Sequence, residues 1–175
     1  MGSAIIICAE LVLCCLIFPT LILQTVGLFT AHWVSNSTCD SIGVIYSCCS
    51  GQDNNTCKNT NGGDELDARV LGLEVTACAM MMVALAMTIF GIWFECQDDE
   101  DEDSECANLV VVCGLIFAGA GILSFVGCMI IVGNFSPSQL GWSFYLCLVS
   151  GSFIILLIVL LLIYVLKEFV GCIYR

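Results

Sequence analysis

Four cysteines gather in one polar stretch of the chain, where thiols could bind a metal, react, or form disulfides. They are Cys39, Cys48, Cys49 and Cys57. A zinc site would need CxxC-like pairs or histidines nearby, and the only histidine is His32, beside Trp33 at the end of an apolar run. We therefore expect no metal here, and a disulfide framework if the stretch faces an oxidising compartment.

The spacing of these cysteines leaves their pairing open. Adjacent Cys48 and Cys49 would close a strained ring, so each is expected to pair with a more distant cysteine. Two connectivities then remain. One joins Cys48 to Cys57 and Cys39 to Cys49, and the other joins Cys39 to Cys48 and Cys49 to Cys57.

No other group of residues indicates catalysis. The sequence shows no His–Ser or His–Cys pair, no nucleophile elbow and no phosphate loop. Glu10 and Glu74 are the acids nearest the apolar interior, and we expect them toward opposite faces of the membrane, too far apart for an acid–base pair. We expect a non-enzymatic protein without a cofactor. Sixteen acids against four bases also exclude a basic, phosphate-binding surface, so we expect no nucleic-acid partner.

An acidic run at 95–106 holds eight acids and no base. An EF-hand needs a central glycine, which this run lacks, so a solvated acidic turn is the expected structure. A weakly bound divalent ion or a basic protein partner is the alternative. Cysteines that lie beside a membrane span are candidates for lipidation. Here they are Cys96, Cys106 and Cys172.

The elements that must position these residues are four long apolar runs. The chain is 59% hydrophobic and only 11% charged, and each run exceeds the roughly 20 helical residues that cross a hydrocarbon core of about 30 Å. The runs do not alternate apolar and polar residues, which argues against barrel strands. The sequence predicts one α-helical membrane domain, a left-handed four-helix transmembrane bundle in contact with membrane lipids. Its predicted spans are 4–28, 70–94, 109–132 and 142–166.

Glycosylation sequons indicate which loops face outward. The N-x-[ST] patterns begin at Asn36, Asn54 and Asn134. All of them lie in the first or third loop between spans, and none lies in the second loop or at a terminus. We therefore expect a plasma-membrane protein with extracellular loops at 29–69 and 133–141. Both termini and the 95–108 loop are expected to be cytoplasmic.

Trp33 is followed by the stretch GVIYSC at 43–48, which begins with Gly43 and ends with Cys48, and by Cys57 eight residues later. This order resembles the first extracellular loop of the superfamily of claudins, peripheral myelin and epithelial membrane proteins, and calcium-channel γ subunits, which carries W, then G-L-W-x-x-C, then C. Ile45 stands where the family has tryptophan. The resemblance implies a small extracellular β-sheet with a hairpin closed by Cys48–Cys57, leaving Cys39 and Cys49 as an extra pair.

Two other stretches are similar to this superfamily. LDARVL at 66–71, with Arg69, resembles the L-Q-A-A-R-A-L start of the claudin second helix, and GWSFYL at 141–146 resembles the opening of the γ-type fourth helix. The short second outer loop departs from typical claudins. The tail also lacks a hydrophobic C-terminal residue, so no PDZ scaffold is expected.

The resemblance implies a non-enzymatic protein that organises cell–cell contact or a paracellular barrier. The alternative is an accessory subunit that binds an ion channel or receptor and modulates its gating or trafficking; a self-assembled pore is a third reading. Its partners would be other membrane proteins, either further copies of itself or a channel. Small residues allow close helix approach in lipid, either laterally or in closing the bundle itself. The predicted lateral interface comprises Gly114, Ala118, Ala120, Ser124 and Trp142.

Overall fold

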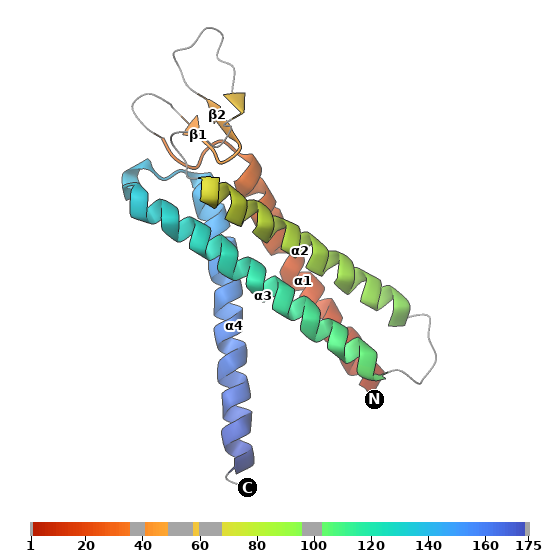
Figure 1. Cartoon of the computed structure of the whole chain (residues 1–175). Coiled ribbons are helices and arrows are strands. Elements are labelled where there is room, and N and C mark those ends of the chain that lie inside the picture. Colours follow the sequence, from red (N-terminus) through yellow and green to blue (C-terminus); the bar gives the residue numbers. More distant parts are fainter. Residues whose placement is uncertain (1, 36–40, 49–57, 60–67, 96–102, 174–175) are drawn as a thin grey trace.

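The computed structural model describes residues 2–35, 41–48, 58–59, 68–95 and 103–173 (Figure 1). Four long helices dominate it: α1 (Gly2–Phe29), α2 (Ala68–Glu95), α3 (Asp103–Asn134) and α4 (Trp142–Ile173). Each contains a segment long and apolar enough to cross a membrane. The prediction of a four-helix bundle with four membrane-length helices is confirmed, and the chain is a four-span integral membrane protein.

The helices satisfy their own backbone polar groups, as a span in lipid requires. The threonine hydroxyl groups are also satisfied within their own helix, because they donate to carbonyl groups of the preceding turn. Thr20 Oγ1 lies 2.8 Å from Ile17 O, and Thr88 Oγ1 lies 2.8 Å from Ala84 O. These threonines therefore add no unsatisfied donor to the apolar helices.

Side chains from all four helices form the core in two clusters. One cluster surrounds Trp33 and Phe144 at the end of the bundle that carries the small sheet described below. We call this end the cap end and the cluster the cap-end core. The second lies farther along the helices and includes Ile17, Met81 and Ile154. The bundle is therefore packed from the cap end to its middle.

The last part of α4 leaves the bundle. In Figure 1 its C-terminal half diverges from α1, α2 and α3. The side chains of its consecutive residues Val159 to Tyr164 are each between 45% and 63% exposed. Because six consecutive residues cover every face of a helix, this segment has no face buried in the bundle.

A small antiparallel sheet stands at the other end of the molecule from the start of α1 and the end of α4 (Figure 1). Its strands β1 (Ser41–Ile42), β2 (Tyr46–Cys48) and β3 (Lys58–Asn59) lie in the order β1-β2-β3. Ile42 pairs with Ser47, and Ser47 also pairs with Lys58. An additional bridge joins Val34 to Ile42, so the sheet is continuous with the chain that leaves α1.

Aromatic pairs lie near both ends of the bundle. The rings of His32 and Trp142 are 5.5 Å apart at the end that carries the sheet, and those of Phe90 and Trp93 are 6.4 Å apart near the far end of α2. Aromatic side chains concentrate at membrane–water interfaces. The two pairs therefore indicate where the apolar part of the bundle meets the two interfaces.

Candidate functional site

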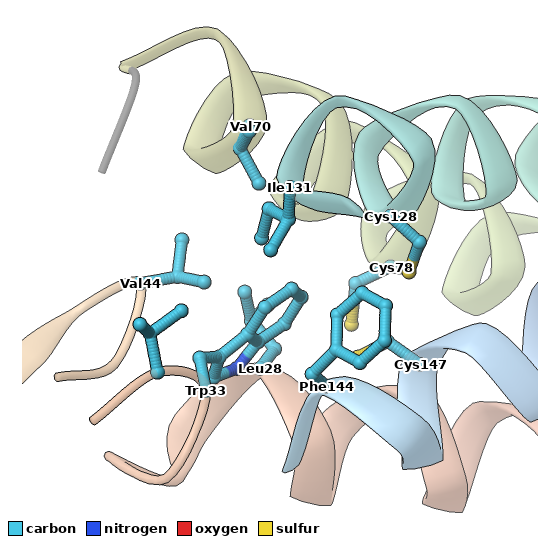
Figure 2. Packing of buried hydrophobic residues seen from close by; sticks show 10 residues of the cluster. Leu28, Trp33, Val44, Val70, Cys78, Cys128, Ile131, Phe144 and Cys147 are labelled. Carbon is cyan, nitrogen blue, oxygen red and sulfur yellow. The ribbon is translucent and has the colours of Figure 1, made fainter. Parts of the chain in front are cut away.

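Trp33 anchors the chain where it leaves α1. Its side chain is 0% exposed and belongs to the cap-end core. Its indole Nε1 donates a hydrogen bond of 2.6 Å to Gly27 O in the last turn of α1. Its ring meets Phe144 of α4 edge to face, with centroids 6.1 Å apart. Figure 2 shows the ring among apolar side chains from α1, α2, α3, α4 and the first loop, so one residue holds several elements together.

Backbone hydrogen bonds join the sheet to both α1 and α4. Trp33 N and Val34 N each donate to Ile42 O at 3.0 Å, and Ile42 N donates back to Val34 O at 2.8 Å. On the other side, Gly141 N donates to Trp33 O at 2.8 Å and Ser143 N donates to His32 O at 3.1 Å. We call this hydrogen-bonded unit, residues 32–34, 41–48 and 140–143, the cap.

Gly43 has a physical reason to be glycine in the cap. A Cβ built on it would lie 2.6 Å from Ala31 Cα and 2.8 Å from Tyr46 O. Both are backbone atoms, which cannot rotate away as a side chain could. The motif glycine is therefore required by the close approach of the first loop to the chain leaving α1.

A second group of side chains, which we call the polar cluster, lies between α1, α2 and α3. It consists of Gln24, Glu74, Ser124 and Cys128. Gln24 Nε2 donates to Glu74 Oε2, and Ser124 Oγ lies 3.0 Å from Gln24 Oε1 and 3.1 Å from Glu74 Oε2. Cys128 Sγ lies 3.6 Å from Glu74 Oε1. All four side chains are 0% exposed, so this is a sealed hydrogen-bonded network among apolar helices.

The polar cluster offers little for metal binding or nucleophilic chemistry. Among the residues that the structure describes, no group of three or more His, Cys, Asp or Glu side chains is arranged to hold a metal ion. The thiols near Glu74 are also sealed from solvent, because Cys78, Cys128 and Cys147 are all buried. The arrangement is suited to holding helices together and to binding a proton.

The structure describes only some of the predicted motif, disulfide, glycosylation and lipidation residues. Trp33 and Gly43 lie in the cap, and Arg69 lies exposed in the first turn of α2. Cys48, Cys106 and Cys172 lie within β2, α3 and α4. The remaining predicted disulfide, glycosylation and lipidation residues lie outside the described ranges: Cys39, Cys49, Cys57, Asn36, Asn54 and Cys96. Their roles stay predictions.

The predicted lateral interface divides between the interior and the surface of the bundle. Ala120 and Ser124 are fully buried, and Ser124 belongs to the polar cluster. Gly114 and Ala118 are half-buried, and Trp142 is 49% exposed. Only the last three have surface that another membrane protein could reach.

Asn134 is the last residue of α3, and its amide is already engaged. Asn134 Nδ2 donates to Ile130 O at 2.8 Å. Two residues on, Ser136 Oγ lies 2.9 Å from Gln139 Oε1, in the turn Pro137–Gln139 that precedes α4. Asn134 and Ser136 are the two residues of this sequon that a glycosylating enzyme recognises. Both of their side chains are therefore hydrogen-bonded within the folded chain.

Sequence reasoning missed the polar cluster. The sequence places Glu74 near one face of the membrane without naming a partner for it, and treats Ser124 as a small residue for close helix packing. A signal was present, because a glutamate and a glutamine inside membrane-length apolar runs require partners. Their pairing depends on how each helix is rotated about its axis, which the runs do not specify.

No protein-family model and no curated protein matches this chain. The likeness of the first loop to the claudin superfamily therefore rests on the motif residues alone.

Proposed function

We propose that this four-span membrane protein is non-enzymatic and organises cell–cell contact or a paracellular barrier at the plasma membrane. The cap is the observation that carries this proposal. Its sheet is joined by backbone hydrogen bonds to the end of α1 and the start of α4, and Trp33 fixes it on the bundle core. A sheet held in this way presents a fixed surface to a partner and loses little conformational freedom on binding.

We place the cap outside the cell, because the sequons flank it, and we propose that a disulfide closes its hairpin. In the sheet, Ser47 of β2 pairs with Lys58 of β3. In the sequence, Cys48 directly follows Ser47 and Cys57 directly precedes Lys58. This register supports the Cys48–Cys57 connectivity that the resemblance implies, and leaves Cys39 and Cys49 for a second pair.

Peptide mapping without reductant is expected to recover Cys48 linked to Cys57, since disulfides persist only in an oxidising compartment. Glycosidase treatment should shift the mobility of the protein, and replacing Asn36 and Asn54 by glutamine should abolish that shift, because the amide of Asn134 is engaged within α3. Free or differently paired Cys48 and Cys57 would contradict the proposed hairpin, and an unshifted native protein would contradict the orientation.

A second candidate function is supported by α4. The exposed segment from Val159 to Tyr164 has apolar surface on every face, which a helix of another membrane protein could contact as well as lipid can. This favours the alternative of an accessory subunit that binds a channel or receptor. In that case the C-terminal half of α4, and not the cap, would make the essential contact with the partner.

A pair of matched substitutions separates the two functions. Tyr46 on β2 is 42% exposed, and Tyr164 on α4 is 61% exposed. If the cap makes cell–cell contacts, Tyr46→Ala should reduce enrichment of the protein at cell borders by about tenfold, the loss that corresponds to roughly 1.4 kcal/mol of contact energy, and Tyr164→Ala should leave it unchanged. Purification in mild detergent provides the second measurement. A stoichiometric channel that is lost on Tyr164→Ala would instead establish the accessory role.

A further inference from the structure

We propose that Glu74 holds a proton in the folded protein, as one member of a closed ring of hydrogen bonds that joins α1, α2 and α3. The ring would run from the Glu74 hydroxyl at Oε2 to Ser124 Oγ, from the Ser124 hydroxyl to Gln24 Oε1, and from Gln24 Nε2 back to Glu74 Oε2. Its ligand is therefore a single proton. This inference does not depend on whether the protein organises cell–cell contact or binds a channel.

Counting hydrogens supports the protonated form. Ser124 Oγ lies 3.0 Å from Gln24 Oε1 and 3.1 Å from Glu74 Oε2, yet a serine hydroxyl has only one hydrogen to donate. If Glu74 were ionised, both oxygens would compete for that hydrogen, and one of the two buried contacts would join two acceptors. With a proton on Oε2, Glu74 donates to Ser124 and Ser124 donates to Gln24. Each contact then has one hydrogen.

The side chains that contact the Glu74 carboxyl group in the described helices are uncharged. They are those of Gln24, Ser124 and Cys128. In the described part of the four helices, the titratable groups near the polar cluster are the thiols of Cys78 on α2, Cys128 on α3 and Cys147 on α4. The α1 member of the cluster, Gln24, does not titrate. An unpaired carboxylate in an apolar interior is costly, whereas a hydrogen-bonded neutral acid is not.

The bundle is shaped to admit this carboxyl group. A Cβ built on Gly127 of α3 would lie 2.7 Å from Glu74 Oε1. A side chain at this position would therefore occupy the space of the carboxyl oxygen that Cys128 Sγ approaches at 3.6 Å. Ser124, Gly127 and Cys128 lie within four positions of each other on α3, so one turn of that helix supplies both the partners and the space.

Infrared spectroscopy of the full chain in lipid vesicles at neutral pH tests the proton directly. We expect the C=O stretching band of a protonated carboxylic acid, which exposed Asp and Glu side chains do not give at this pH. The band should be lost in Glu74→Gln, which keeps the shape of the side chain without an ionisable proton. Glu10→Gln, the matched change at the other acid within an apolar run, should retain it.

Ser124→Ala keeps the test decisive if Glu74→Gln does not fold. Removing the Ser124 hydroxyl takes away the acceptor of the Glu74 proton, so the band should shift to higher frequency without being lost. Absence of the band from the native protein would overturn the proposal. A band that is removed by Glu10→Gln, or that neither Glu74→Gln nor Ser124→Ala alters, would overturn it as well.

Discussion

Replacing Trp33 by alanine is expected to destabilise the folded protein by about 3–5 kcal/mol, the usual range for removing a buried aromatic ring from a core. The ring is 0% exposed and packs edge to face on Phe144, so its removal leaves a cavity between the cap and the bundle. The indole Nε1 bond of 2.6 Å to Gly27 O is lost at the same time. Unfolding by denaturant in detergent micelles, followed by far-UV circular dichroism, measures the change.

Two further substitutions separate the contributions to this loss. Trp142→Ala removes the same type of side chain from the same end of the protein, but that side chain is 49% exposed, so we expect a loss below about 1 kcal/mol. Trp33→Phe keeps an aromatic ring and removes the N–H donor, and should cost roughly 1–3 kcal/mol because Gly27 O loses a partner. Equal effects of Trp33→Ala and Trp142→Ala would contradict the anchoring role of Trp33.

The four helices could be predicted from sequence because one physical requirement dominates them. A helix in lipid satisfies its backbone internally and needs about 20 apolar residues, and both conditions can be read directly from the runs. The helices exceed the predicted spans at several ends. In α4, for example, the structure continues from 166 to Ile173. Composition marks the apolar core of a helix, whereas its end depends on capping and on the chain that follows.

The cap was predictable only in part. The order of Trp33, Gly43 and Cys48 indicated a structured first loop, but not that Trp33 O and His32 O accept hydrogen bonds from Gly141 and Ser143 at the start of α4. Those contacts join segments more than 100 residues apart in the sequence. No local pattern encodes them, since they follow from how α1 and α4 pack.

The polar cluster shows the same limit within the membrane. Gln24, Glu74 and Ser124 come from three different runs, and only the rotation of each helix brings them together. In this arrangement Glu74 on α2 contacts Gln24 on α1 and Ser124 on α3. The cluster therefore illustrates how a polar residue that is unfavourable in one isolated helix specifies the arrangement of several helices.

Gly27→Ala is expected to destabilise the folded protein, whereas Gly114→Ala is not, although both add one methyl group to a membrane helix. A Cβ on Gly27 would lie 2.5 Å from Cys147 Sγ and 2.9 Å from Ser143 O, whereas a Cβ on Gly114 would meet nothing within 4 Å. Overpacking at a closely packed site costs about 1–3 kcal/mol. At the open site alanine should be neutral, or stabilising by up to about 1 kcal/mol, because it is the better helix former.

The reason for the large effect at Gly27 lies in the path of α4. Gly27 is where α1 approaches the first turns of α4, and the C-terminal half of α4 then diverges from the bundle (Figure 1). Contacts of its N-terminal half with α1 and with α3 therefore hold α4 on the bundle, and Gly27 is one of the closest on the α1 side. Adding Cys147→Ala to Gly27→Ala should recover part of the lost free energy, since it removes the sulfur but not the Ser143 carbonyl group. The double-mutant cycle, measured by unfolding in micelles, gives this coupling; equal destabilisation by Gly27→Ala and Gly114→Ala, or zero coupling to Cys147, would show that α1 and α4 do not meet at Gly27.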